Sequence, residues 1–142
     1  MSITIKKSNP DKPPRILIYG EAGSGKTTFG ARAKKPIFLS AEGGTDRVTD
    51  SDGNPIDEFE NISSWDSLKE VMAFLLAGKH DYKTVALDSA DWIEKLAHGK
   101  VIGSSGKSIT TCNGGYGSGY RESERLHVQL IESLSKIREK RG

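Results

Sequence analysis

The chain has 142 residues, enough for one domain, with 35% hydrophobic and 28% charged residues. Its net charge of +2 excludes a basic field over the whole molecule, and its single cysteine excludes an internal disulfide. No apolar run approaches the ~20 residues that span a bilayer, and residues 1–15 lack the apolar segment of a secretory signal. We therefore expect a cytoplasmic protein that does not contact membranes.

The first half of the chain predicts two buried strands and one helix. Residues 1–14 end in a proline-rich stretch and are expected to form an extended N-terminal arm. The apolar run 15–19 predicts a buried parallel strand, residues 26–33 a helix, and the run 36–40 a second buried strand. The sequence Asp-Gly-Asn-Pro at 52–55 predicts a surface hairpin or loop.

The middle of the chain predicts an amphipathic helix and a third strand. Ser63 or Ser64 is suited to cap this helix, and Gly78 is suited to end it. The apolar residues of the helix share one face: Trp65, Leu68, Val71, Met72, Leu75 and Leu76. The apolar run 84–88 predicts the third buried strand, followed by a helix to about residue 98.

The last part of the chain predicts a loop and a long helix. Residues 103–119 are so rich in Gly and Ser that we expect a mobile loop. The helix is predicted over 120–140, with an apolar face of Leu126, Leu130, Ile131, Leu134 and Ile137. Apolar strands alternating with helices predict an α/β fold with a parallel sheet, helices on both faces and a ligand at the carboxyl ends of the strands. We therefore divide the chain into the arm 1–14 and one core domain, 15–142.

Residues 20–28, GEAGSGKTT, match the phosphate-binding pattern G-x-x-x-x-G-K-[ST] between a predicted strand and a predicted helix. The glycines permit the backbone to curl, so that successive N–H groups point at a phosphate, and the start of the helix adds partial positive charge. Lys26 is predicted to contact the β- and γ-phosphates, and the Thr27 hydroxyl to bind Mg²⁺. The predicted nucleotide-binding residues are Gly20, Glu21, Ala22, Gly23, Ser24, Gly25, Lys26, Thr27 and Thr28.

Two acids are predicted to complete the site. Asp88 ends the third predicted strand and is expected to hold Mg²⁺ through water, the alternative being a cap on the helix that begins at Ser89. Glu42 follows the second strand and is predicted to be catalytic together with Lys26, acting as general base for the attacking water. Asp46 is the competing acid, and a solvated loop position is the alternative for Glu42.

The stretches GEAGSGKTT, FLSAEGG and VALDSADW resemble the RecA-like branch of P-loop ATPases. The pattern ISSW, an amphipathic helix, YKTVALDS and GYGSGYRESERL resembles phage-encoded AAA-type nucleotide-binding proteins related to single-strand annealing recombinases. The resemblance covers about residues 14–141 and implies a three-layer P-loop NTPase fold with a mostly parallel sheet. It also implies ATP and Mg²⁺ as cofactors, and ATP-dependent work on single-stranded DNA in phage recombination or replication, in the host cytoplasm.

The sequence departs from this resemblance at its end. Relatives continue after the last helix with a strand that carries a sensor residue, whereas the sequence here ends at Gly142. Either the chain is C-terminally truncated or the natural protein is short, and in both cases we expect an incomplete sheet whose edge a second copy covers, in a homo-oligomer. Arg121 or Arg125 is a candidate finger for the site of a neighbouring copy, with a solvated helix face as the alternative. Without finger and sensor, the isolated chain is expected to hydrolyse ATP slowly.

The loop 103–119 is also a candidate DNA contact. Lys107 is expected near phosphates, and Tyr116 or Tyr120 is expected to stack on bases. A flexible surface loop without a ligand is the alternative.

Two other functions stay open at this stage. A nucleoside or small-molecule kinase needs an arginine-rich lid, and the only candidate lid, 103–119, has one Lys and no Arg. A nucleotide-binding module without catalysis is the other. A GTPase is disfavoured, because the sequence has no N-K-x-D motif.

Overall fold

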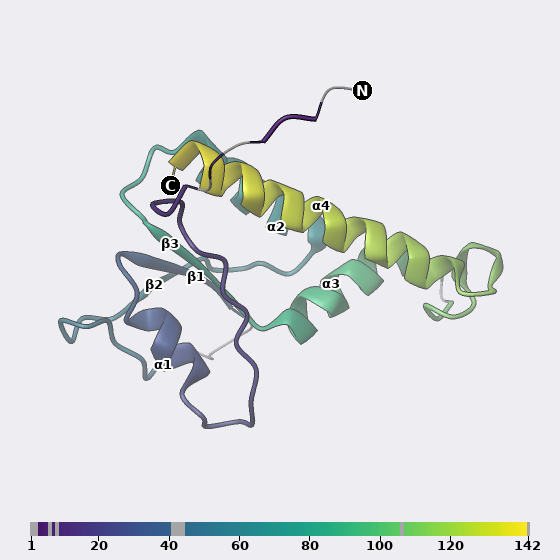
Figure 1. The fold of residues 1–142 in the computed structure, drawn as a ribbon. Helices are drawn as coiled ribbons and strands as arrows, with labels where there is room; N and C mark the ends of the chain where they lie inside the picture. The colour runs from purple at the N-terminus through teal and green to yellow at the C-terminus, as the bar shows by residue number, and fades with distance from the viewer. Residues whose placement is uncertain (1–2, 6, 8, 41–44, 106, 142) are drawn as a thin grey trace.

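A computed structural model describes residues 3–5, 7, 9–40, 45–105 and 107–141 of the chain. The elements in chain order are α1 (Lys26–Ala31), β1 (Pro36–Ser40), β2 (Asp57–Glu58), α2 (Trp65–Ala77), β3 (Thr84–Asp88), α3 (Ala90–Ile102), the 3-10 turn η1 (Cys112–Gly114) and α4 (Ser118–Arg141). Figure 1 shows a small sheet with α1 on one side and the longer helices on the other. None of the helices within the described ranges is long and apolar enough to cross a membrane.

The sheet has three parallel strands in the order β2-β1-β3. Ser40 and Asp88 lie opposite each other at the carboxyl ends of β1 and β3. Because side chains alternate along a strand, Phe38 and Asp88 point to the same face of the sheet. A Cβ atom on Gly30 of α1 would lie 3.1 Å from the Phe38 ring, so α1 packs closely on this face. The side chain of Asp88 therefore lies on the side of the sheet that carries α1.

The opposite face of the sheet forms the hydrophobic core with α2, α3 and α4. Ile37 and Leu39 of β1 point into this core and are 2% and 0% exposed. The other buried members of the core are Ile62, Trp65, Leu68, Met72, Leu75, Ile93, Ala97, Leu130 and Ile137. Burial of each large aliphatic side chain contributes ~1.5–3 kcal/mol. The predicted parallel sheet with helices on both faces is confirmed.

The boundaries of α2 follow the predicted capping residues. The Ser64 hydroxyl accepts a hydrogen bond from the Ser67 backbone N–H at 3.1 Å, and the Ser67 hydroxyl accepts one from the Ser64 N–H at 3.0 Å. Gly78 ends the helix in the left-handed conformation, with φ at +70°. These reciprocal bonds pair backbone donors that the first turn of a helix leaves without partners.

Residues 15–19, predicted as a buried strand, form no strand in the structure. Ile16, Leu17 and Tyr19 are 63%, 85% and 90% exposed. An apolar run becomes a central parallel strand only where strands flank it and helices cover both of its faces. Among the described residues nothing covers this segment, as its exposure shows. The prediction of a first strand is therefore wrong.

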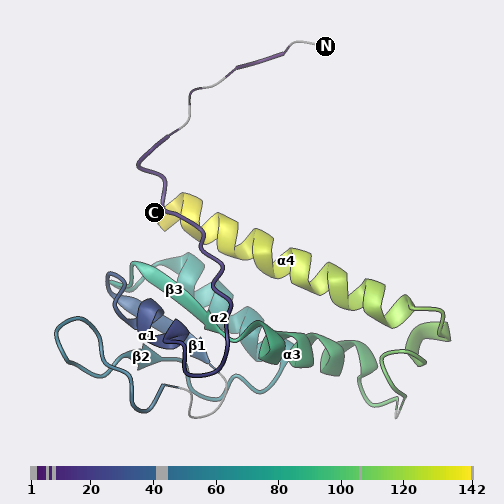
Figure 2. The same cartoon turned by 60° about the horizontal axis from the view of Figure 1, so that its bottom comes forward.

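The segment before the P-loop is held on α4 instead. Lys12 pairs with Glu139 at 3.2 Å, and the Arg15 Nη1 donates to the Ser135 Oγ at 3.1 Å. Figure 2 shows the N-terminal chain leaving the end of α4 and running past the sheet toward α1. These polar contacts tether one end of the exposed apolar segment.

α3 and the first half of α4 form a helical hairpin that projects beyond the sheet, with residues 103–105 and 107–117 at its end (Figures 1 and 2). α3 continues to Ile102, past the predicted end at residue 98. Ile131, predicted on the apolar face of α4, is 56% exposed, so that assignment is wrong. α2 and α3 cover the neighbouring stripe of α4, which carries the buried Leu130 and Ile137.

The predicted surface turn is confirmed between β1 and β2. Thr49 and Pro55 form an antiparallel bridge. The Asp50 carboxylate accepts hydrogen bonds from the backbone N–H groups of Asn54 and Asp52, at 2.8 and 2.9 Å. The bond from Asn54 is the main reason why the pKa of Asp50 is lowered.

Candidate nucleotide-binding site

The P-loop, residues 20–25, leads into α1 and is exposed to solvent. Gly23 and Gly25 have φ angles of +80° and +87°, in the left-handed region that favours glycine. The backbone N–H groups of Ala22, Gly23 and Gly25 have no acceptor among the residues that the structure describes. Unpaired donors on a curled, exposed backbone are the groups that bind phosphate in such loops.

Lys26 is the first residue of α1, and its side chain turns back into the loop. The Nζ atom donates to the backbone oxygens of Gly20 and Glu21, both at 2.8 Å. An ammonium group has three donors, so one remains for a ligand. The loop therefore holds a cation where P-loop proteins bind the β- and γ-phosphates.

Thr27 and Asp88 meet on the α1 side of the sheet. The Thr27 hydroxyl donates to the Asp88 Oδ2 at 2.5 Å. The N-cap residue of α3 is Ser89 and not Asp88, and the Asp88 side chain bonds to Thr27 instead. The structure thus brings together the two residues that the sequence assigned to Mg²⁺.

The groups at this contact fit a magnesium ion. A hydroxyl and a carboxylate supply the oxygen ligands that Mg²⁺ prefers, and phosphates and waters usually complete its coordination. Within the described part of the chain, no group of three or more His, Cys, Asp or Glu side chains is placed to hold a metal. An ion at Thr27 and Asp88 would therefore take its remaining ligands from nucleotide and water.

The acids after β1 are only partly described. Glu42 lies at 41–44, outside the described residues. Asp46, its competitor, is exposed. Sequence reasoning missed a third acid, Glu58 of β2, whose Oε2 accepts a hydrogen bond from the Ser40 hydroxyl at 2.5 Å. Glu58 belongs to no motif, and only the pairing of β2 with β1 shows its place beside the site.

The candidate DNA-contacting residues lie at the end of the helical hairpin, not beside the P-loop (Figures 1 and 2). Tyr116 is 99% exposed. Tyr120 is 48% exposed, and its ring packs edge-on against His98 with centroids 5.8 Å apart. Lys107 is exposed. Of the two candidate tyrosines, Tyr116 is therefore the more exposed.

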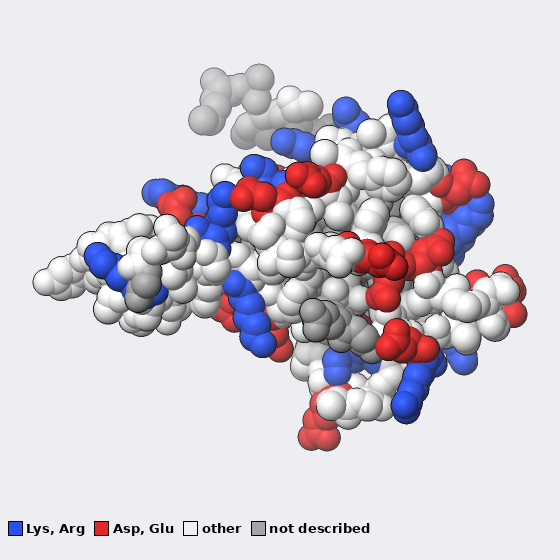
Figure 3. Space-filling view, turned by 180° about the vertical axis from the view of Figure 1, so that it is seen from behind, with Lys and Arg blue, Asp and Glu red and all other residues white. Residues whose placement is uncertain are grey.

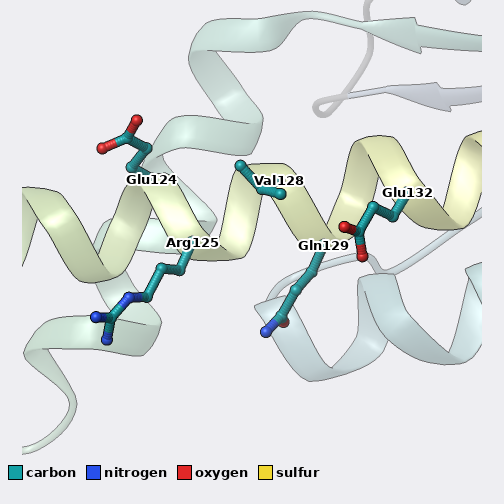
Figure 4. A pocket seen from close by; sticks show the side chains of 5 residues that line it. All are labelled: Glu124, Arg125, Val128, Gln129 and Glu132. Atoms are coloured by element: carbon teal, nitrogen blue, oxygen red, sulfur yellow. The ribbon is translucent and has the colours of Figure 1, made fainter. Parts of the chain in front are cut away.

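The two candidate finger arginines lie on the outer surface of α4. Arg125 pairs with Glu122 at 2.9 Å, and Arg121 has no side-chain partner within the described ranges. Arg125 is one of the residues that line a hollow on this helix, and Figure 4 shows it with the others, Glu124, Val128, Gln129 and Glu132. That hollow contains no P-loop residue, so we do not assign the nucleotide to it.

Positive and negative side chains are interspersed on the face shown in Figure 3. This distribution agrees with the small net charge of +2. That face carries no broad basic patch of the kind that binds nucleic acid, so DNA binding there would depend on local contacts.

The loop at the end of the hairpin is closely packed at its junction with α4. The Ser118 hydroxyl donates to the backbone oxygens of Asn113 and Gly115, both at 2.7 Å. A Cβ atom on Gly119 would lie 2.2 Å from the Ile109 backbone oxygen and 2.6 Å from the Cys112 sulfur. Only glycine fits at this junction without displacing the backbone.

We expect Gly119→Ala to destabilise the chain by ~1–3 kcal/mol, because overpacking forces the backbone apart. The thiol of Cys112, now 2% exposed, should then react faster with a thiol reagent. Gly99→Ala is the matched control, since nothing lies within 4 Å of a Cβ there and alanine favours the helix by ~0.5–1 kcal/mol. Equal thiol reactivity in both variants would contradict the packing at Gly119.

Comparison with known proteins agrees with this geometry. Residues 12–140 match the family model described as AAA domain. The chain is 33% identical over 86 residues to the SPbeta prophage-derived uncharacterized protein YorG of Bacillus subtilis (strain 168), an alignment that covers 58% of the chain. The chain spans only 25% of the length of that curated relative. No solved structure matches the chain. Since the family match extends from the N-terminal segment through α4, the chain belongs to the AAA-domain family of P-loop nucleotide-binding proteins.

Proposed function

We propose that this chain is a Mg²⁺-dependent ATPase of the RecA-like kind that acts on single-stranded DNA in phage recombination or replication. The observation that carries the proposal is the 2.5 Å contact between Thr27 and Asp88, beside a glycine-rich loop that holds Lys26. The AAA-domain family supports the use of a nucleotide. The resemblance of the motifs to phage recombination proteins, and the prophage origin that the name of YorG states, support the context.

In the proposed reaction the loop N–H groups and the Lys26 ammonium bind the β- and γ-phosphate oxygens and fix the γ-phosphorus. Thr27 and Asp88 would hold Mg²⁺, Asp88 through water, and the bound ion supplies neutralisation of the phosphate charge. Glu42 accepts the proton of the water that attacks the γ-phosphorus. The bond from that phosphorus to the β-phosphate oxygen breaks, and ADP and phosphate leave.

A neighbouring copy completes the site in this proposal. Arg121 and Arg125 are exposed on the part of α4 that projects away from the sheet (Figures 1 and 2). They are therefore better placed to reach another copy than the P-loop of their own chain. In P-loop enzymes such a finger is worth ~10³–10⁵ in rate. The isolated chain is slow for this reason.

Phosphate release from ATP, measured with and without single-stranded DNA while light scattering gives the mass, tests the function. The proposal expects slow hydrolysis by a monomer, and faster hydrolysis when DNA and self-association are present. Rapid hydrolysis by a verified monomer without DNA would refute the role of a neighbouring copy.

We expect Tyr116→Ala to weaken single-stranded DNA binding by about 5- to 150-fold, the loss of one stacked base. Hydrolysis without DNA should not change, because Tyr116 belongs to the segment between η1 and α4, and this segment lies at the end of the hairpin, away from α1 and the P-loop (Figure 2). Ile131→Ala removes another exposed apolar side chain, 56% exposed, outside the loop and serves as the control. Fluorescence anisotropy with a labelled oligonucleotide measures the affinity, and unchanged affinity would remove Tyr116 from the DNA contact.

A further inference from the structure

The outer side of α4 exposes apolar side chains. The inner side of this helix packs on α2 and α3 through Leu130 and Ile137, which are 7% and 8% exposed. Away from that contact, Val128 and Ile131 are 48% and 56% exposed. Figure 2 shows α4 on the outside of the molecule, with the sheet, α2 and α3 all to one side of it. Within the described part of the chain, the middle of α4 therefore has a side that no other element covers.

Charges are ordered along this uncovered side. Arg121, Arg125, Val128 and Glu132 follow one another at intervals of four, three and four residues, so they lie along one stripe of the helix. Figure 4 shows Arg125 and Glu132 on either side of Val128 along α4, around the hollow that they line. Arg125 pairs with Glu122 at the surface, and Glu132 makes no ion pair with the residues that the structure describes. The stripe thus carries cations before an apolar centre and an anion after it.

The N-terminal arm limits the stripe at its C-terminal end. Arg15 donates to Ser135 at 3.1 Å, and Lys12 pairs with Glu139 at 3.2 Å. Residues of α4 from about 135 onward are therefore occupied by the chain itself. The part that is free to bind a partner is 121–132.

We infer that this stripe is the docking surface for α4 of a second copy of the chain, in an antiparallel pair centred at Val128. A two-fold axis midway between Arg125 and Glu132 falls next to Val128 in the helix. It places Arg125 of each copy opposite Glu132 of the other and brings the two Val128 side chains together. A parallel pair would place Arg125 against Arg125 and Glu132 against Glu132. The order of the charges therefore selects both the partner and its direction.

The contact is expected to be weak and to depend on concentration. A single stripe of one helix is smaller than a stable interface of ~1,600 Å², so the chain should be monomeric when dilute and dimeric when concentrated. Burial of Val128 supplies apolar stabilisation, and the exposed ion pairs mainly set the direction of the helices. This role of Arg125 between copies does not depend on ATP hydrolysis, so the inference goes beyond the proposed function.

Charge reversal tests the antiparallel pair directly. Sedimentation equilibrium, from low micromolar to near-millimolar protein, measures the dissociation constant of the dimer. Arg125→Glu and Glu132→Arg should each weaken self-association about tenfold or more, because each replaces both attractive pairs by pairs of like charge. Glu70→Arg is the matched control, since it makes the same charge change at an exposed position of α2.

Mixing the two variants separates the pairing of charges from any loss of folding. One variant then offers two acids and the other two arginines, so an equimolar mixture should form a heterodimer as tight as the unmodified dimer. The double variant, Arg125→Glu with Glu132→Arg, should also associate with itself again, because both pairs are present with their signs exchanged.

Three outcomes would overturn the inference. An unmodified chain that stays monomeric at every concentration has no such contact. Self-association that Glu132→Arg and Glu70→Arg leave equally strong would place the contact elsewhere, such as at the open edge of the sheet. Single variants that stay apart when mixed would exclude the antiparallel order. Self-association that follows these charges supports the inference even if the chain hydrolyses no ATP, which would refute the proposed function alone.

Discussion

Replacing Lys26 by Ala is expected to abolish most nucleotide binding and to lower ATP turnover by on the order of 10²–10³, the effect of removing one preorganised donor from a charged transition state. Lys26 is the one cation held inside the P-loop in the described structure, through 2.8 Å bonds to the backbone oxygens of Gly20 and Glu21. Without it, the N–H groups of the loop alone would face the triphosphate. Calorimetric titration with Mg·ATP and a phosphate-release assay measure the two effects.

The variant also tests whether the loop itself depends on this side chain. Lys26→Ala removes two hydrogen bonds that close the exposed loop, but it removes no core side chain, so thermal unfolding should change little. Lys34→Ala is the matched control, because Lys34 is an exposed lysine outside the P-loop. Binding heat and turnover that match the unmodified protein would exclude residues 20–28 as the nucleotide site.

The elements that the sequence predicted well are those whose evidence is local. β1 and β3 are short apolar runs, and α2 has its capping serine, its apolar face and its terminating glycine within the same stretch of chain. Each of these signals depends on near neighbours only, and packing in the folded chain agrees with them. The sequence assigned Thr27 and Asp88 to one Mg²⁺ on similar local evidence, and the structure adds a direct hydrogen bond between the two side chains.

The elements that were missed depend on partners distant in sequence. Residues 15–19 have a stronger apolar pattern than β2, yet β2 forms and they do not. β2 has only two residues, Asp57 and Glu58, and its pairing with β1 holds it in place, including the bond from the Phe59 N–H to the Phe38 oxygen at 2.9 Å. A strand of two residues is too short to show a hydrophobic periodicity from which it could be predicted. The place of Glu58 beside Ser40 was hidden for the same reason.

Exposure of residues 16–19 has a consequence for the site. The segment joins the tether of Arg15 on α4 to Gly20, the first residue of the P-loop. The P-loop is thus fixed to the sheet mainly from its other end, through Thr27 and the packing of α1 on Phe38. Stability of the loop therefore depends on the contact between Thr27 and Asp88 more than in a domain where a buried strand precedes the loop.

Replacing Asp88 by Asn is expected to lower turnover by on the order of 10², because the negative charge that attracts Mg²⁺ is removed. The amide oxygen of Asn can still accept the hydrogen bond from Thr27, now 2.5 Å long, so the loop should stay in place. The Mg²⁺ concentration that gives half-maximal hydrolysis should rise, whereas binding of ATP without metal should change little. Phosphate release measured across a magnesium titration separates these effects.

The matched control is Asp91→Asn, which neutralises an exposed acid in the first turn of α3 close in sequence to Asp88. Asp88→Ala adds a second comparison, because it removes both the charge and the acceptor for Thr27. If the proposed roles hold, the alanine variant raises the magnesium requirement as Asp88→Asn does, and it also weakens nucleotide binding, since the start of α1 loses its bond to the sheet. Turnover that Asp88→Asn leaves intact, with an unchanged magnesium requirement, would place the metal elsewhere and leave the contact with Thr27 a structural one.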